Sequence, residues 1–152
     1  FRSTVLSEYQ GSFGCPFCCI GGNKMIEAYS NNLAVNAGDT INFSTSIRTN
    51  NNMSLSGNAI VIRTAGVYKV TFTGNFVATS EGVAGVQLYT NGTAFSRGKA
   101  EATATAGGIA NLAFANTIQV TNAPTGNIAT ITLVNSIAGT WNLADVIVEK
   151  LS

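Results

Sequence analysis

The residues most suited to chemistry are three cysteines near the start of the chain, Cys15, Cys18 and Cys19. The first two form a C-x-x-C motif, which thiol-disulfide oxidoreductases use with the first thiolate at a helix N-terminus inside a βαβ unit. The residues that follow, CIGGNK, do not begin a helix. Because the sequence has no histidine, three cysteines also leave a tetrahedral zinc site one ligand short within one chain. We therefore expect the three cysteines to form crosslinks, and their odd number favours one disulfide between two subunits.

Side chains suited to catalysis are otherwise sparse. The absence of histidine removes most acid–base, triad and metal-ligand schemes that operate at neutral pH. The seven acidic residues show no motif spacing, and they are Glu8, Glu27, Asp39, Glu81, Glu101, Asp145 and Glu149. We predict that the protein is not an enzyme and has no catalytic, cofactor-binding or metal-binding residues.

The composition indicates self-association. Charged residues make up 10% of the 152 residues, whereas about 25% is typical of globular proteins. Some of the neutral and apolar surface is therefore expected to contact copies of the same chain. The eight Lys and Arg residues are scattered and the net charge is +1, which argues against a nucleic-acid partner. No apolar run approaches the roughly 18 to 20 residues of a membrane helix, so no membrane partner is expected.

Residues 1–24 differ in character from the rest and are predicted to form an N-terminal connector arm, not part of the core. They hold all the cysteines and end near a Gly21-Gly22 hinge. Fully extended, such a segment reaches on the order of 80 Å, several times the radius of a domain of this size. It also carries apolar residues that could anchor it to another subunit, namely Val5, Leu6, Phe13, Phe17 and Ile20. Because the sequence starts at Phe1 and not at Met, we expect a mature or trimmed form.

Residues 25–152 are predicted to form one β domain, organised around the run Gly66–Ala78. Tyr68, Val70, Phe72 and Phe76 fall on one parity, and polar residues fall on the other, which is the pattern of a long strand with one core face. Gly74 interrupts the apolar parity at a place where we expect a bulge or the close approach of a neighbouring backbone.

Other strand-like runs are separated by turn-forming residues, and helix signals are nearly absent. The runs are Met25–Ser30, Thr40–Phe43, Thr45–Thr49, Met53–Leu55, Ala59–Arg63, Gly82–Thr90, Thr93–Ser96, Ile109–Thr121, Asn127–Ser136 and Ala144–Leu151. Asn91-Gly92 is the strongest hairpin signal, because type I′ turns need positive φ at both central residues. The small-residue stretch Gly98–Gly108 fits either an edge strand or a loop, and we favour the loop.

The strand patterns also predict which residues are buried. Tyr68, Phe72, Phe114 and Val146 are assigned to core or trimer packing. The terminal run Ala144–Leu151 is apolar on both parities, which predicts a strand in the interior of a sheet. Trp141 is expected in a loop before that strand and is the best single candidate for an exposed contact.

Three runs in this order resemble a known family. They are AIVIRTAGVYKVTFTGNFVATSEGVAGVQLYTNGTAFSRG from Ala59, NLAFANTIQVTNAPTGNIATITLVNS, and ADVIVEKLS at the end. The aliphatic strand, the Gly-Val-Tyr-Lys-Val motif, the Asn-Gly hairpin and the terminal Val-Ile-Val-Glu-Lys are similar to the C-terminal domain of the BclA exosporium glycoproteins of Bacillus spores. That family lies within the wider superfamily of tumour necrosis factor and the complement globular heads.

The resemblance implies a jelly-roll β-sandwich of about ten strands that forms a tight homotrimer. It also implies an extracellular or particle-surface protein without catalysis. BclA-like proteins carry a collagen-like Gly-X-Y stalk before this domain, and here the cysteine-bearing arm takes its place, so the function of the stalk does not carry over.

The sequence thus predicts a structural, self-assembling protein of a bacterial cell or spore surface, whose arm links one trimer to the next in a fibre. Its main partner would be itself. The alternative is a binding module, either a phage virion decoration or fibre head or an adhesin tip, with a surface glycan or protein as its ligand. The fold alone does not decide between these roles.

Overall fold

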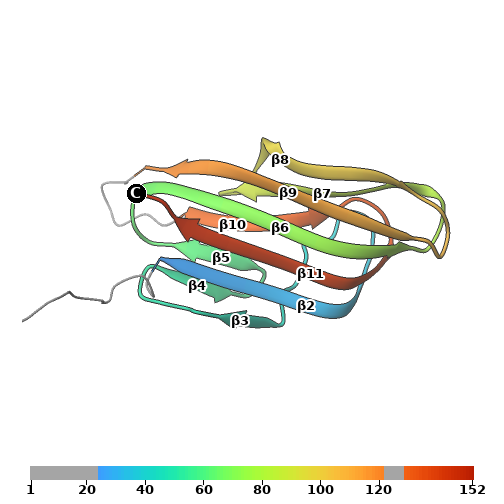
Figure 1. Ribbon diagram of the computed structural model, residues 1–152, viewed down its shortest axis with the longest axis horizontal. Helices are drawn as coiled ribbons and strands as arrows, with labels where there is room; N and C mark the ends of the chain where they lie inside the picture. The colour runs from blue at the N-terminus through green and yellow to red at the C-terminus, as the bar shows by residue number, and fades with distance from the viewer. Residues whose placement is uncertain (1–23, 122–128) are drawn as a thin grey trace, which may run out of the picture.

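The computed structural model describes residues 24–121 and 129–152, which form an all-β sandwich (Figure 1). The strands are β2 (Met25–Val35), β3 (Thr45–Ile47), β4 (Met53–Ser56), β5 (Ala59–Ile62), β6 (Gly66–Ala78), β7 (Gly82–Thr90), β8 (Thr93–Ala104), β9 (Ile109–Val120), β10 (Ala129–Asn135) and β11 (Gly139–Lys150). One five-stranded sheet has the order β4-β5-β10-β7-β8, and the other has the order β3-β2-β11-β6-β9. The chain crosses repeatedly between the two sheets, so the predicted jelly-roll sandwich is confirmed.

The long strand β6 has the bounds predicted from its alternation. It pairs with β11 on one side and with β9 on the other, so it lies inside its sheet. The terminal strand β11 lies between β2 and β6, which confirms its predicted interior position. Side chains of even-numbered residues of β6 face the other sheet and are buried, because successive side chains of a strand point to opposite faces.

Gly74 lies where a neighbouring strand approaches closely, as expected. The register between β6 and β11 shifts between Trp141 and Leu143, so Asn142 is an extra residue in β11. A Cβ on Gly74 would lie 2.6 Å from a ring carbon of Trp141 and 2.9 Å from the carbonyl oxygen of Leu143. The bulge is therefore in β11, opposite the glycine, and Gly74 leaves room for the indole.

Trp141 is the main correction to the sequence predictions. It lies within β11, not in a loop, and its exposed fraction is 0%. Its ring centroid lies 4.9 Å from that of Phe76 and 5.5 Å from that of Phe72, with an edge-on arrangement in the second pair. Trp141 is thus a core residue and not an exposed contact.

Two other segments also differ from their predictions. The Gly98–Gly108 stretch is mostly strand, because β8 continues to Ala104 and pairs with β7 up to Gly82. Thr40–Phe43 does not form a strand, although Thr40 makes an isolated bridge to Val134. In both segments the pairing partner, and not the local composition, decides the backbone conformation.

The β7–β8 hairpin has the predicted Asn91-Gly92 turn, with φ of 51° and 79°. Further along the hairpin, the register shifts between Gln87 and Tyr89, and the strands bulge. Nε2 of Gln87 lies 2.7 to 3.2 Å from the carbonyl oxygens of Leu88, Phe95 and Gly98. This one amide therefore satisfies backbone acceptors that the bulge removes from the ladder.

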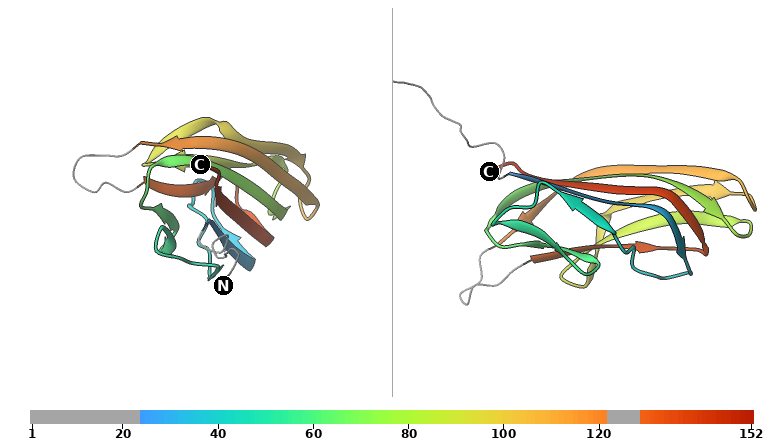
Figure 2. Two further views of the ribbon diagram at one scale, coloured as in Figure 1. Left: turned by 60° about the vertical axis from the view of Figure 1, so that its left-hand side comes forward. Right: turned by 90° about the horizontal axis from the view of Figure 1, so that it is seen from below.

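The sandwich has two distinct poles, which can be followed in Figure 2. At the terminal pole, the N–H of Lys150 donates to the carbonyl of Lys24 and the N–H of Leu151 donates to the carbonyl of Val67. The start of β2 and the end of β11 therefore lie side by side. The distal pole holds the loops 36–39, 79–81, 105–108 and 136–138, which backbone hydrogen bonds tie together.

Candidate functional site

All of the residues that the sequence analysis assigned to crosslinking and anchoring lie outside the described residues. These are Cys15, Cys18, Cys19, Val5, Leu6, Phe13, Phe17 and Ile20. Within 24–121 and 129–152, no group of three or more His, Cys, Asp or Glu side chains is placed to hold a metal ion. The same residues contain no helix that is long and apolar enough to cross a membrane.

The predicted packing residues lie in or beside the core. Tyr68, Phe72 and Val146 are fully buried, whereas Phe114 is only partly buried and stacks on Phe72 with ring centroids 5.8 Å apart. The hydroxyl of Tyr68 is hydrogen-bonded although the residue is buried. It donates to the carbonyl of Thr64 at 2.8 Å and accepts from the side-chain amide of Asn52. Phe114 lies on the edge strand β9, where the second sheet ends.

The strongest candidate for an assembly surface is the outer face, which we define as the side of the β3-β2-β11-β6-β9 sheet turned away from the core. On β6 and β9 it is made of neutral, mostly small side chains, apart from Lys69. Those on β9 are Ile109, Asn111, Ala113, Ala115, Thr117 and Gln119, and all are exposed. Nδ2 of Asn75 donates to Oδ1 of Asn111 at 2.6 Å, which joins the two strands across this surface. A second protein surface could pack closely here without burying charges.

Large apolar side chains add to this surface. Ile109 is 64% exposed at the start of β9, and Ile47 on β3 is 40% exposed. Ile47 is paired with Glu27 of β2, so both belong to the outer face. Two of the four large exposed apolar side chains of the described residues therefore lie on this one face, which is a feature of interaction surfaces.

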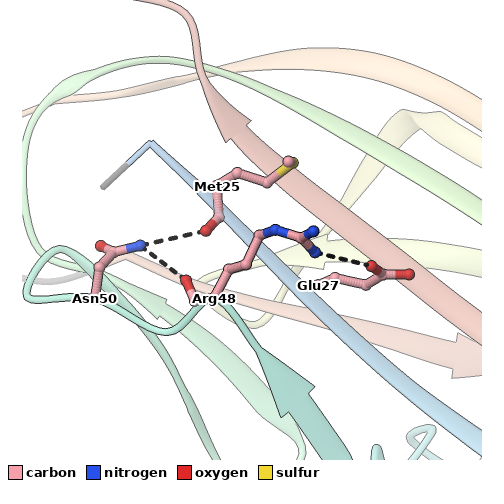
Figure 3. Close-up of polar contacts among 4 residues, drawn as sticks. All are labelled: Met25, Glu27, Arg48 and Asn50. Atoms are coloured by element: carbon pink, nitrogen blue, oxygen red, sulfur yellow. Dashed lines mark hydrogen bonds and ion pairs between the residues drawn. The ribbon is translucent and has the colours of Figure 1, made fainter. Parts of the chain in front are cut away.

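The β2–β11 half of the outer face carries most of its charge. Nη1 of Arg48 lies 3.8 Å from Oε1 of Glu27, and Nδ2 of Asn50 donates to the carbonyls of Met25 and Arg48 (Figure 3). Burial, followed by a hydrogen bond and charge repulsion from Glu27, raises the pKa of Asp145 from its usual 3.8 to about 7. This half of the face is therefore the part whose charge changes near neutral pH.

Sequence reasoning did not find this pair. Glu27 and Asp145 lie near opposite ends of the domain sequence. They are close in space only because β2 and β11 pair in a defined register. The available signal was weak: each is an acidic residue inside a strand-like run of a chain that is poor in charge.

A smaller feature lies on the opposite sheet. The residues that line a hollow there include Gly85, Gln87, Lys99, Glu101 and Ser136. The hydroxyl of Ser136 donates to the carbonyl of Val83 at 3.0 Å. Lys99 and Glu101 give the hollow one positively and one negatively charged side chain with which a small ligand could interact.

The connectivity and the two sheets define a jelly roll of the kind found in tumour necrosis factor-like proteins and complement globular heads. No family model matches the sequence, and no curated protein matches it. Among solved structures, Eiger TNF from S. frugiperda is similar with a TM-score of 0.66 and 11% identity, over 86% of this chain and 94% of that one. The globular domain of zebrafish complement 1qA protein gives 0.63 and 9%, over 85% and 97%. The PRD1 vertex protein P5 gives 0.54 and 12%, over 86% and 98%. At these identities the likeness concerns the fold.

Proposed function

We propose that the protein is a structural, self-assembling surface protein without catalytic activity. Residues 25–152 would form a homotrimeric jelly-roll head, similar to the C-terminal domain of the BclA family, and residues 1–24 would connect one trimer to the next. The assembly would be an extracellular fibre on a bacterial cell or spore. The observation that carries this proposal is the β6–β9 half of the outer face, a sheet surface on which Lys69 is the one charged side chain among the described residues.

The outer face supports self-association for a physical reason. Exposed Ala113 and Ala115, with Ile109 further along the same strand, form a low surface without long charged side chains. A different surface of a neighbouring copy can approach it closely, as the heterologous contacts of a ring require, and burying it removes apolar area from water at about 25 cal/mol per Å². A closed ring of three copies would cover this face in every subunit and leave no copy of it exposed.

The position of Lys24 supports a head-to-tail fibre. Its carbonyl accepts the N–H of Lys150, so the chain enters the sandwich at the terminal pole, beside the other end of the chain. A connector that starts at this pole can reach a neighbouring trimer along the fibre axis while the distal pole stays free. Repeating this heterologous contact generates a filament. An extended segment can dock by adding a strand to a sheet edge or by filling a groove.

Removing residues 1–22 tests the proposal. The shortened protein should remain trimeric in light scattering but should form no filaments in electron microscopy. Replacing Cys15, Cys18 and Cys19 by Ser should weaken the filaments and leave the trimer unchanged. A monomer at micromolar concentration would refute the trimeric head, and filaments of the shortened protein would refute the connector.

A binding module is the second candidate, as a virion decoration or fibre head or as an adhesin tip. The likeness in fold to the PRD1 vertex protein P5 favours a virion role, and the hollow lined by Gly85 could receive a glycan or a protein side chain. Electron microscopy of the purified full-length protein separates the two candidates. Discrete trimers under conditions of high concentration would favour the binding module, and filaments would favour the fibre.

A further inference from the structure

Two carboxyl groups lie against each other on the outer face. On the paired strands β2 and β11, Asp145 is opposite Tyr29 and Glu27 is opposite Ile147, so the two acids are neighbours on one diagonal. When both carboxyl groups are ionised they repel each other, and a proton on one of them removes that repulsion and lets it donate to the other.

The groups around Asp145 do not supply a compensating cation. Its direct neighbours across the sheet are Tyr29 on β2 and Thr73 on β6, neither of which is charged at neutral pH. Arg48 approaches Glu27 and not Asp145, and its side chain is 55% exposed. Oδ1 of Asp145 is buried and has no hydrogen-bond partner in the described part of the chain. A negative charge at this oxygen is therefore poorly compensated.

The other charged groups of the outer face are further along the strands. Lys69 of β6 is opposite Glu149 of β11, two residue pairs beyond the pair that holds Ile147. Both side chains are exposed, so water screens them. The protonation state of the carboxyl pair is thus decided mainly by its own contact and by how much water reaches it.

We propose that packing of a second copy on the outer face is coupled to proton uptake by the Glu27–Asp145 pair, so that the trimer is weakened as pH rises above neutrality. The proton comes from solvent, resides on Asp145 and is donated to the carboxylate of Glu27. This inference rests on the proposed trimer and names a condition that regulates it. It requires that the docked copy also covers the β2–β11 half of the outer face, where it excludes the water that still stabilises the ionised form in a single subunit.

The direction and size of the effect follow from linkage. In the single subunit the pKa of Asp145 is already raised to about 7, mainly by burial. Below this pH, monomer and trimer both hold the proton, so association does not change with pH. Above it, each subunit takes up as much as one proton on association. Three protons per trimer would raise the concentration of half-dissociation by up to about 30-fold per pH unit.

Fluorescence-detected sedimentation velocity of the labelled full-length chain measures this directly. The fractions of monomer and trimer would be followed over a dilution series at pH 6.5, 7.5 and 8.5, with circular dichroism as a check that the monomer stays folded. We expect a half-dissociation concentration that rises about 20-fold between pH 7.5 and 8.5 and about 5-fold between pH 6.5 and 7.5, because titration of the single subunit is centred at about pH 7. Heats of dilution in two buffers with different ionisation enthalpies would independently give the number of protons released per subunit.

Three variants locate the effect. Asp145→Asn keeps the shape and can still donate to Glu27, so its trimer should have the same half-dissociation concentration at all three pH values. Glu27→Gln removes the repulsion but not the burial, which is the largest cause of the raised pKa of Asp145, so it should shift the rise to lower pH without abolishing it. Glu101→Gln, on the opposite sheet, is the matched control and should keep the wild-type profile.

Trimers with a pH-independent half-dissociation concentration and no net proton release would overturn this inference and leave the proposed trimer intact. A wild-type pH profile in Asp145→Asn would also overturn it. Monomers at every pH would instead refute the proposed trimer, and the coupling with it.

Discussion

Replacing Gly74 by Ala tests how the core and the β11 bulge fit together. The added Cβ would lie 2.6 Å from one ring carbon of Trp141, 2.9 Å from another and 2.9 Å from the carbonyl oxygen of Leu143. Ordinary carbon contacts are about 3.5 to 4 Å, so the indole or the β11 backbone would have to move by most of an ångström. Neither has free space, because Phe72 and Phe76 pack against the indole and β11 is hydrogen-bonded on both sides.

The expected loss of stability is about 2 kcal/mol. Overpacking of a closed core costs about 1 to 3 kcal/mol, and this position should lie at the upper end because both a ring and a backbone oxygen obstruct the methyl group. Alanine regains about 0.5 to 1 kcal/mol, since glycine loses more conformational entropy when a strand forms. For a domain of this size, the melting temperature should fall by roughly 6 to 10 °C.

Gly82→Ala is the matched control. It is the same substitution in β7 of the other sheet, and its Cβ would meet Ile137 at 3.6 Å, an ordinary van der Waals contact. Its melting temperature should be equal to that of the wild type or slightly higher. Both variants would be measured by differential scanning calorimetry at one protein concentration and one pH.

A second substitution identifies the obstructing group. Trp141→Phe removes the part of the indole nearest to Gly74, so it should destabilise the wild type but cost less in the Gly74→Ala background. The coupling between the two should be about 1 kcal/mol or more, because the residues are in contact. Equal melting temperatures for Gly74→Ala and Gly82→Ala would refute the reasoning about the close approach.

Three further predictions concern the core, the hairpin and the carboxyl pair. Phe72→Ala should cost about 3 to 5 kcal/mol in urea unfolding, because the ring is fully buried between two aromatic residues; an unchanged midpoint would contradict this. Gln87→Glu places an acceptor against three carbonyl oxygens and should cost about 1 to 3 kcal/mol, whereas equal stability at neutral pH would show that the amide does not support the bulge. The raised pKa of Asp145 means that the folded chain holds a proton that the unfolded chain releases. That stabilisation is complete below pH 3.8 and is lost as pH rises to about 7, so the melting temperature relative to Asp145→Asn should decline across this window; a constant difference would argue against the assignment.

The sequence was most informative where alternation was strict. The bounds of β6 were predictable because its apolar residues keep one parity from Tyr68 to Phe76, and because bends precede Gly66 and follow Ala78. Asn91-Gly92 was predictable because few residues other than Asn and Gly adopt positive φ in succession.

Prediction failed where pairing overrides local pattern. Trp141 was expected in a loop because the apolar run starts at Ala144, but pairing extends β11 back to Gly139, and the extra residue Asn142 changes the parity so that the indole faces the core. The Ala- and Thr-rich part of β8 has no alternation to read, and it is extended because β7 pairs with it. The contact of Glu27 with Asp145 depends in the same way on a register between strands that are remote in sequence.

The separation of the poles has a practical consequence for protein engineering. Because Lys24 and Lys150 are hydrogen-bonded neighbours, a fusion partner attached before β2 or after β11 would emerge at the terminal pole. The turn between Thr105 and Gly108 lies at the distal pole, and Gly107 has a φ of 75° with open space around it. A peptide epitope inserted beside Gly107, with that glycine retained, would be presented far from the fusion partner. The domain can therefore serve as a display scaffold in which cargo and epitope occupy opposite ends and do not obstruct each other.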